Sequence, residues 1–351
     1  MMEPVRAGII GAGGIAQTHL RALSEVPEIK VLAVADIIQE RADKTAETWH
    51  IPQAFDDYHK ILQDDEIEAV IITTFNQAHR APTIDALQAG KHVLLEKPMA
   101  ATLEDATAIA RAAHRSDKLT MIALKTRYSP VMQAAKMIMD AGTLGDIYYA
   151  ETVAARRCGI PGGSFIRKAS AGLGTVADIG VYCLDEALNL MGHPKPVSVS
   201  GIANNILGRT CSPVLGSWQW VPEDLEVEDF GVAWVRFENG AAMVFKTSWI
   251  MHMNEIGGTF FLGTKAGLKL NPLTVFRHEW GMLTDTMPQN IPQIEGIELF
   301  RREQRAFADA IRNNKPSPIP VEQMLLTNVI IQGLLDSAAA GHEVAVTVPE
   351  L

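Results

Sequence analysis

The stretch at residues 5–16 reads Val-Arg-Ala-Gly-Ile-Ile-Gly-Ala-Gly-Gly-Ile-Ala, and it decides the fold of the first half of the chain. Its apolar start predicts a buried strand, and Gly11 predicts the tight turn that follows. Gly13 leaves room for the backbone to approach a pyrophosphate, and Ala16, in place of a third glycine, still permits close helix packing. A helix beginning near Gly14 directs free N–H groups at phosphates. The alternative is a glycine turn in an unrelated α/β protein. The predicted dinucleotide-binding residues of this turn are Gly11, Gly13, Gly14, Ile15 and Ala16.

An acidic residue after the next apolar run indicates which dinucleotide the turn binds. Residues 31–35 predict a second strand, and Asp36 follows it directly. An acidic side chain at this point can bind both ribose hydroxyls of NAD and repel the 2′-phosphate of NADP. Two isoleucines, rather than an arginine, come next, so the pattern favours NAD. Arg41 is close enough to keep NADP possible, and a capping role is the alternative for Asp36.

The size and composition of the chain restrict its class. At 351 residues it is long enough for two domains, and a hydrophobic content of 47% suits globular proteins. The formal net charge of −10 disfavours a nucleic-acid partner. No signal peptide or membrane-spanning run is recognisable. Cys158, Cys183 and Cys211 fit neither a disulfide framework nor a zinc site. We therefore expect a cytoplasmic protein with no metal and no membrane partner.

Two patterns of secondary structure divide the chain. In residues 1–123, apolar runs alternate with amphipathic helical segments, which predicts a doubly wound parallel sheet. In residues 124–351, strands follow one another closely, and Glu238-Asn239-Gly240 is a hairpin turn signal. This half predicts an α+β domain with a mostly antiparallel sheet. Three of its helices are predicted over residues 176–191, 298–313 and 321–340.

Polar residues at the carboxyl ends of the predicted parallel strands are candidates for ligand contact, because open α/β sheets bind ligands at that edge. Lys97 can hydrogen-bond a substrate hydroxyl or ketone oxygen, and its charge can lower the pKa of a neighbouring acid. A solvated lysine paired with Glu96 is the alternative. Leu124-Lys125 ends the next strand at the same edge. The predicted cofactor contacts from these strand ends are Thr74, Asn76, His79, Glu96 and Lys97.

Two further candidates lie in the second half of the chain. Asp178 and Tyr182 are four residues apart, so on one helix they share a face. Tyr182 can give and take a proton, but its ordinary pKa is about 10, and near neutral pH it needs a cation such as Lys97. Asp178 can bind a substrate hydroxyl or orient the lysine. A cap and a packed core tyrosine are the alternatives. Arg127 and Arg156 are weaker candidates for a polar sugar pocket.

Three segments together resemble the Gfo/Idh/MocA oxidoreductases. They are the glycine turn, Ala-Gly-Lys-His-Val-Leu-Leu-Glu-Lys-Pro at 89–98, and Gly-Leu-Gly-Thr-Val-Ala-Asp-Ile-Gly-Val-Tyr at 172–182. By that resemblance, Lys97 matches the catalytic lysine of the family and Asp178 matches its aspartate. The resemblance also implies that the second domain has a large open sheet through which such enzymes form dimers or tetramers.

One position departs from the inositol dehydrogenase pattern of this family. Those enzymes carry histidine where this chain has Tyr182, which resembles the glucose–fructose oxidoreductase and dihydrodiol dehydrogenase branch. The difference disfavours inositol as the substrate. Leu173, in place of a glycine, and Thr74-Phe75-Asn76, in place of Thr-Pro-Asn, also differ from the family pattern.

We therefore expect an NAD(P)-dependent dehydrogenase that acts on a CH–OH group of a sugar, sugar derivative or cyclitol. Lys97 and Tyr182 would relay the proton, and the substrate contacts would be Lys97, Arg127, Arg156, Asp178 and Tyr182. A redox-neutral, NAD-dependent glycosidase and a non-catalytic NAD(P) sensor remain as alternatives. The retained lysine, aspartate and tyrosine argue against the sensor, because a sensor needs no proton relay.

Overall fold

The first sheet has the parallel, doubly wound topology that the sequence predicts. The computed structural model describes residues 3–351. Its first sheet has six parallel strands in the order β3-β2-β1-β4-β5-β6, so the strand order reverses beside β1. Ligands bind at such a reversal, at the carboxyl ends of the strands. The strands are β1 (Val5–Ile10), β2 (Ile29–Ala35), β3 (Gln53–Phe55), β4 (Ala69–Ile72), β5 (His92–Glu96) and β6 (Thr120–Ala123).

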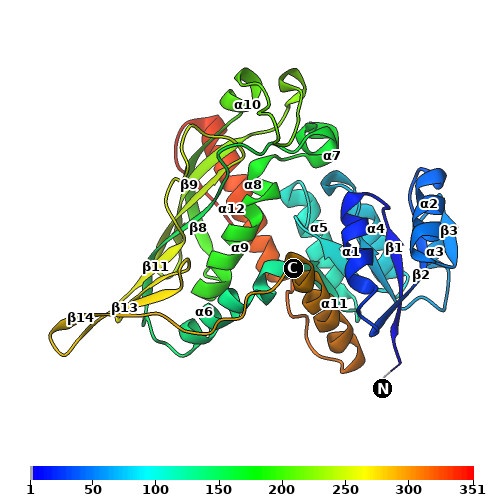
Figure 1. Cartoon of the computed structure of the whole chain (residues 1–351), viewed down its shortest axis with the longest axis horizontal. Helices are drawn as coiled ribbons and strands as arrows, with labels where there is room; N and C mark the ends of the chain where they lie inside the picture. Colours follow the sequence, from blue (N-terminus) through cyan, green and yellow to red (C-terminus); the bar gives the residue numbers. More distant parts are fainter. Residues whose placement is uncertain (1–2) are drawn as a thin grey trace.

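Helices cover both faces of this sheet, which explains why its central strands are apolar on both sides. All four residues of β4 are buried, as are four of the five in β5. Figure 1 shows α2 beside β2 and β3, with α1 and α4 closer to the centre of the molecule. The helices are α1 (Gly14–Leu23), α2 (Gln39–Trp49), α3 (His59–Leu62), α4 (Arg80–Gln88) and α5 (Leu103–Arg115), with the short turn η1 (Asn76–Ala78).

The second sheet is larger than the sequence predicts. It has nine strands in the order β14-β13-β12-β11-β7-β10-β9-β8-β15, and all neighbours are antiparallel except β7 and β10. The hairpin β13–β14 extends one edge and is absent from the sequence prediction, because only Thr274 and Val275 are buried and no alternating pattern results. The strands are β7 (Ile147–Ala155), β8 (Pro196–Asn204), β9 (Phe230–Phe237), β10 (Ala242–Ser248), β11 (Phe260–Gly263), β12 (Gly267–Lys269), β13 (Thr274–Glu279), β14 (Met282–Thr286) and β15 (Val344–Ala345).

Helices fill the space between the two sheets (Figure 1). Helix α9 packs on β7, and α12 packs on β8 and against α5 of the first domain. Within residues 3–351, the opposite face of the large sheet has no helix on it (Figure 1). The remaining elements are η2 (Lys125–Tyr128), α6 (Pro130–Asp140), η3 (Gly163–Ile166), α7 (Lys168–Ala171), α8 (Thr175–Asp178), α9 (Gly180–Met191), α10 (Ile206–Thr210), η4 (Pro222–Asp224), α11 (Gly296–Arg312) and α12 (Val321–Ala340).

The helix predicted over residues 176–191 is broken at Ile179. Helix α8 ends at Asp178, and α9 begins at Gly180. A Cβ atom on Gly180 would lie 2.8 Å from Phe245 Cζ and 3.2 Å from Thr247 Oγ1, both on β10. The glycine thus allows the start of α9 to pack directly on the sheet. The break separates Asp178 from Tyr182, which the sequence predicts on one continuous helix.

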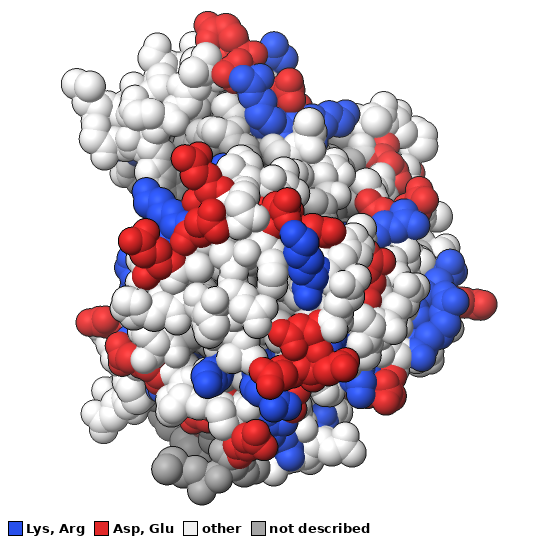
Figure 2. Space-filling model, turned by 90° about the vertical axis from the view of Figure 1, so that its right-hand side faces the viewer, with Lys and Arg blue, Asp and Glu red and all other residues white. Residues whose placement is uncertain are grey.

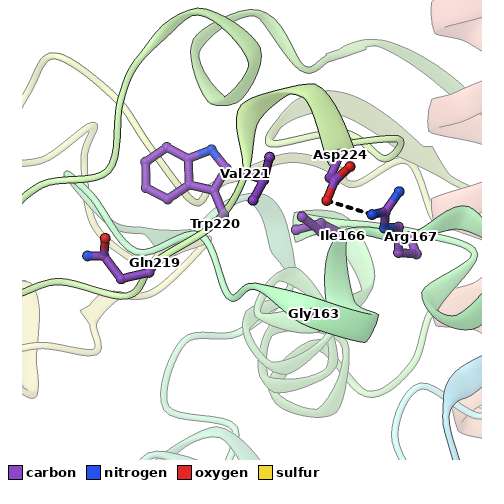
Figure 3. A pocket seen from close by; sticks show the side chains of 7 residues that line it. All are labelled: Gly163, Ile166, Arg167, Gln219, Trp220, Val221 and Asp224. Carbon is purple, nitrogen blue, oxygen red and sulfur yellow. Dashed lines mark ion pairs between the residues drawn. The ribbon is translucent and has the colours of Figure 1, made fainter.

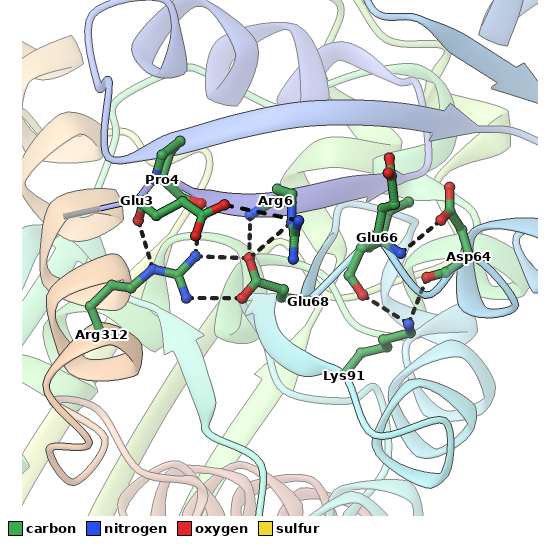
Figure 4. A network of polar contacts seen from close by, with 9 residues as sticks. Glu3, Pro4, Arg6, Asp64, Glu66, Glu68, Lys91 and Arg312 are labelled. Atoms are coloured by element: carbon green, nitrogen blue, oxygen red, sulfur yellow. Dashed lines mark hydrogen bonds and ion pairs between the residues drawn. The ribbon is translucent and has the colours of Figure 1, made fainter.

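The end of the chain returns to the first domain. Phe307 of α11 is fully buried in the core that includes β1 and β4. Arg312, at the end of the same helix, donates two hydrogen bonds to Glu68 (2.9 and 2.7 Å) and two to the carbonyl oxygens of Glu3 and Pro4 (Figure 4). This ion pair joins the C-terminal part of the chain to the first strand.

Charged side chains on the outer side of the molecule are mixed in sign. On the face drawn in Figure 2, Lys and Arg residues are interspersed with Asp and Glu residues. Within residues 3–351, no helix is long and apolar enough to cross a membrane.

We expect the Glu68–Arg312 pair to stabilise the fold in a pH-dependent way. The hydrogen bonds from Arg312 lower the pKa of Glu68 from its usual 4.5 to about 2. Glu68→Gln should therefore lower the free energy of unfolding at neutral pH by roughly 2 kcal/mol. Since a lowered carboxyl pKa stabilises the folded state only above that pKa, the difference should shrink as pH falls from 4.5 to about 2.

Urea unfolding of both proteins over this pH range measures the effect. Glu66→Gln, at an exposed position nearby, is the control and should change the stability by less than about 0.5 kcal/mol. A difference between wild type and Glu68→Gln that does not vary with pH would contradict the account.

Candidate active site

The glycine turn after β1 leaves an open space at the start of α1. Gly11 has a φ of +98°, and a Cβ atom there would lie 2.9 Å from the backbone of Thr73. At Gly13 and Gly14, a Cβ atom would meet no atom within 4 Å. No side chain caps the helix, so its first N–H groups point into this space. A pyrophosphate fits such a site through backbone N–H groups and the helix dipole.

Asp36 lies at the carboxyl end of β2, beside this turn. Its Oδ2 accepts a hydrogen bond from the Ala12 N–H (2.9 Å), and its Oδ1 accepts one from Ile38 (3.0 Å). The Arg41 guanidinium approaches Oδ1 at 3.5 Å. The carboxylate is therefore held next to the phosphate-binding turn, where it fits the ribose hydroxyls of NAD. Arg41 is the nearby cation that could meet a 2′-phosphate.

The residues after β4 support the loops of the site. Asn76 Nδ2 donates to the Ala171 carbonyl (2.9 Å), which ties the first domain to the second. The Thr74 hydroxyl donates to the carbonyl of Ala78 (3.3 Å). His79 is fully buried, and its ring nitrogens lie 2.9 and 3.1 Å from the carbonyl oxygens of Pro98 and Thr74. We conclude that His79 is enclosed by protein between two backbone segments, whereas the sequence predicts it as a direct cofactor contact.

Glu96, also predicted as a cofactor contact, is buried behind Lys97. Its Oε1 lies 2.7 Å from His19 Nε2, and its Oε2 accepts a hydrogen bond from the Lys97 backbone N–H (3.0 Å). Burial raises the pKa of Glu96, but its contact with His19 lowers that pKa. The net shift is downward. A charged Glu96 thus fixes the end of β5. Gln304 of α11 donates to the His19 carbonyl (3.2 Å) and completes this support.

Lys97 connects the two halves of the molecule at the expected strand edge. Its Nζ donates to the Asp178 carbonyl (2.7 Å) and to Asp178 Oδ1 (3.3 Å), and it lies 4.7 Å from the centre of the Tyr182 ring. Trp249 Nε1 donates to Asp178 Oδ2 (2.9 Å). The Lys97 and Asp178 side chains remain 12% and 15% exposed, so both can reach a ligand. The predicted trio of Lys97, Asp178 and Tyr182 is therefore brought together.

The surroundings of the Tyr182 hydroxyl differ from the prediction. The sequence predicts that Lys97 lowers its pKa, but burial, followed by the negative charges of Glu96 and Glu303, raises that pKa well above its ordinary value. The hydroxyl is hydrogen-bonded to Lys125 Nζ, whereas Lys97 reaches only the ring. The cation expected at the hydroxyl thus comes from a different strand.

Arg127 lies outside the trio, contrary to the prediction of a substrate contact. Its Nε donates to Asp185 Oδ2 (2.8 Å), its Nη2 to Asp185 Oδ1 (2.5 Å), and its Nη1 to Gln323 (2.6 Å). Arg127 and Asp185 are both buried, with 7% and 1% of their surfaces exposed. The guanidinium is therefore a buried structural group that ties η2 to α9 and α12.

Arg156, in contrast, lies beside the trio. Its Nη1 is 4.0 Å from Asp178 Oδ2, and its guanidinium lies 4.7 Å from the centre of the Trp218 ring. The Trp218 side chain is 52% exposed. Asp178 is thus flanked by an indole donor on one side and a guanidinium backed by an exposed aromatic ring on the other. Such surroundings suit a ligand rich in hydroxyl groups and apolar ring faces.

A separate pocket of about 310 Å³ lies among the loops at residues 163–167 and 219–224 (Figure 3). The Arg167–Asp224 ion pair (2.5 Å) lies along one side, and Trp220 and Gln219 lie along another (Figure 3). The lining residues do not include Lys97, Asp178 or Tyr182. We therefore place the chemistry at the strand edge and not in this pocket.

Comparison with known families agrees with this geometry. Residues 5–124 match the family described as "Oxidoreductase family, NAD-binding Rossmann fold", and residues 132–269 match "GFO/IDH/MocA C-terminal domain". The chain belongs to the Gfo/Idh/MocA family of oxidoreductases. It is an oxidoreductase, and its first domain binds NAD. The expected family, fold class and cofactor are confirmed.

Relatives of the chain are similar over nearly its whole length. A protein of Escherichia coli (strain K12) named D-glucoside 3-dehydrogenase is 29% identical over 97% of each chain. A scyllo-inositol 2-dehydrogenase (NAD(+)) of Bacillus subtilis (strain 168) is 29% identical over 90% of this chain and 88% of its own. The solved structure of a levoglucosan dehydrogenase in complex with NADH has a TM-score of 0.84 at 21% identity, and covers 99% of this chain and 100% of its own. That structure shows that the fold is shared.

We expect Asp36 to set the choice between NAD and NADP. Asp36→Ala removes the charge that repels a 2′-phosphate and leaves Arg41 free to bind it. The preference for NAD over NADP, as a ratio of dissociation constants, should fall by about tenfold, or about 1.4 kcal/mol. Calorimetric titration with NAD and with NADP measures the two dissociation constants.

The double variant Asp36→Ala/Arg41→Ala is the control for the contribution of Arg41. It should bind NADP more weakly than Asp36→Ala alone. An unchanged cofactor preference in Asp36→Ala would remove Asp36 from ribose recognition.

Proposed function

We propose that the protein is a dehydrogenase that oxidises a secondary hydroxyl group of a pyranose ring, in a sugar or glycoside, with NAD as the hydride acceptor. The contact of Lys97 with both Asp178 and Tyr182 at the carboxyl end of β5 carries this proposal. A lysine and a tyrosine beside a nicotinamide site can bind and deprotonate a carbinol. Two relatives that extend over most of the chain are named for a glucoside and an inositol, and both names describe rings of neighbouring hydroxyls.

Each residue of the trio has a distinct role in the proposal. The Lys97 ammonium holds the substrate oxygen and stabilises negative charge that develops on it. Asp178, oriented by Trp249, accepts a hydrogen bond from an adjacent hydroxyl. Tyr182 takes the proton of the reacting hydroxyl. The bound nicotinamide supplies the acceptor for the hydride, chemistry that belongs to the cofactor.

Arg156 and Trp218 extend the proposed substrate site. Arg156 is near enough to Asp178 to bind a second hydroxyl, and Trp218 offers an exposed face to the apolar side of a ring. Buried hydrogen-bonding groups discriminate strongly against ligands that leave them unpaired. A substrate with several neighbouring hydroxyls is therefore favoured over a simple alcohol.

A panel of pyranosides, free sugars and cyclitols tests the proposal. With NAD present, the absorbance of reduced nicotinamide should rise with one class of ring substrate. Cleavage of a glycoside without net formation of reduced nicotinamide would instead indicate a redox-neutral glycosidase. Binding of NAD with no reaction across the panel would indicate a sensor.

We further propose that the chain divides functionally into the cofactor domain at 1–123 and the substrate and assembly domain at 124–351, with α11 packing back on the first. The open face of the large sheet would form the contact in a homodimer or homotetramer. Cross-strand neighbours on that face include Trp234 and Val244, with Phe260 on β11. Apolar surface of this kind favours burial in an interface. Free thiols at Cys158, Cys183 and Cys211 suit a cytoplasmic location.

We expect Lys97→Met to separate catalysis from cofactor binding. Loss of the ammonium should lower kcat by about 10²- to 10⁴-fold, because the substrate oxygen loses its charged partner. The dissociation constant for NAD should change only slightly, since the glycine turn and Asp36 are unaffected. Steady-state kinetics and calorimetry measure the two quantities. Equal activity in Lys97→Met would remove Lys97 from the mechanism.

We expect Val244→Asp to weaken the assembly. A carboxylate on the open face would be buried without a partner in a sheet-to-sheet contact. Light scattering after size-exclusion chromatography should show the wild type as an oligomer and the variant shifted towards the 38.2 kDa monomer. A monomeric wild type would rule out the proposed interface.

A further inference from the structure

Two lysines contact Tyr182, but they do so in different ways. Lys97 Nζ donates to the carbonyl and to Oδ1 of Asp178, and it lies 4.7 Å from the Tyr182 ring centre. Lys125 Nζ is hydrogen-bonded to the Tyr182 hydroxyl and lies 4.3 Å from the ring centre. Only Lys125 is therefore in direct contact with the oxygen that exchanges the proton.

The fold brings Lys125 to this place from a neighbouring strand. Strand β6 lies beside β5, and Lys125 follows its end as the first residue of η2. Lys97 follows the end of β5 at the same edge. Lys125 Nζ also lies 4.7 Å from the centre of the Phe300 ring, which belongs to α11. The lysine thus contacts two aromatic rings, one of them the reacting tyrosine.

The surroundings of Lys125 favour an amine that can lose its proton. Burial lowers the pKa of Lys125 below its ordinary value, and the positive charge of Lys97 acts in the same direction. The negative charges of Glu96, Glu303 and Asp178 oppose this shift, but the net direction is downward. The titratable groups that face Lys125 are Glu96 and Lys97 from the end of β5, Asp178 from α8, Tyr182 from α9 and Glu303 from α11.

Glu303 is the second unusual group here. It is fully buried, and neither of its carboxyl oxygens has a hydrogen-bond partner among the described residues. It lies one turn beyond Phe300 on α11. Burial raises the pKa of Glu303 well above its ordinary value. Glu303 is thus a second buried titratable group that acts on Lys125.

We propose that Lys125 is a catalytic residue, the proton acceptor that completes the Tyr182 relay, and that Lys97 serves mainly to hold Asp178 and the substrate oxygen. This inference rests on the proposed dehydrogenase function. In the oxidation, the O–H bond of the substrate breaks and its proton bonds to the Tyr182 oxygen. The original proton of Tyr182 moves at the same time to the neutral Lys125 amine, whose lone pair forms the new N–H bond.

Tyr182 is protonated before and after this step, so no free phenolate is required. The hydrogen of the substrate carbon leaves as hydride to the nicotinamide, so the products are a ketone, reduced nicotinamide and the Lys125 ammonium. Because Tyr182 gains one proton as it gives up another, its raised pKa is compatible with catalysis at neutral pH. Reduction of a ketone runs through the same groups in reverse.

Lys125→Met and Lys125→Arg together test the proposal. If Lys125 accepts the proton, both variants should lose kcat by about 100-fold or more, because arginine keeps the charge but stays protonated. If Lys125 only stabilises a phenolate by its charge, Lys125→Arg should retain activity, and that result would overturn the proposal. Lys265→Met, at an exposed position, is the control and should behave as wild type.

The pH dependence of kcat distinguishes a proton acceptor from a residue with a merely structural role. In the wild type, kcat should rise with pH as Lys125 loses its proton and then level off. In Lys125→Met this step should disappear, while KM and the dissociation constant for NAD change little. Retention of the same step in Lys125→Met would assign it to another group and contradict the proposal.

A titration of the protein without substrate tests the same lysine independently of activity. Carbon-13 labels at the lysine Cε atoms report each amine, and the signal lost in Lys125→Met or Lys125→Arg identifies Lys125. Its pKa should lie below the ordinary 10.5. A value at or above 10.5 would overturn the proposal. Since no substrate is present, this outcome is distinct from a failure of the proposed function.

Discussion

The Lys97 ammonium joins the two halves of the molecule at the point where a ligand would bind. It extends from the end of β5 and meets the carbonyl and carboxylate of Asp178 at the end of α8. Two contacts support this lysine. Glu96 fixes the end of β5 through its contact with His19, and Trp249 of the second domain orients Asp178. A lysine with fewer partners in this half-buried place would lose hydration without compensation. The site therefore depends on the close approach of the two domains, and not on either domain alone.

The segment α8–α9 supplies both partners of Lys97 in the second half of the chain. Asp178 ends α8 and Tyr182 lies in the first turn of α9, and both contact the lysine. Gly180 has no Cβ atom, which lets the start of α9 pack closely against Phe245. Burial, followed by the negative charges around it, raises the pKa of Tyr182 well above its ordinary value, so the basicity needed for oxidation must come from a neighbour. This is why two lysines, rather than one, belong in the account of the reaction.

Local patterns in the sequence predict the first domain well. They do not predict contacts between residues that are far apart in the sequence. The glycine turn, Asp36 and the strand ends are defined within short stretches, so β1 to β6 and the position of Lys97 follow from them. The contact of Lys125 with Tyr182 spans 57 residues, and that of Trp249 with Asp178 spans 71. No spacing rule reports such pairs. Arg127 was assigned to the substrate because a lone arginine shows no partner in the sequence, whereas the fold pairs it with Asp185. Similarly, the buried residues of the hairpin β13–β14, Thr274 and Val275, are adjacent and produce no alternating pattern.

The central claim is that this site removes a hydride from a ring carbon of its substrate and transfers it to NAD. Mass spectrometry of the nicotinamide after reaction with ring substrates deuterated at single carbons tests it most directly. The account predicts that deuterium from one ring position appears in the reduced cofactor in proportion to the ketone formed. Conversion of the substrate with no deuterium retained in the cofactor pool, and no ketone product, would contradict it.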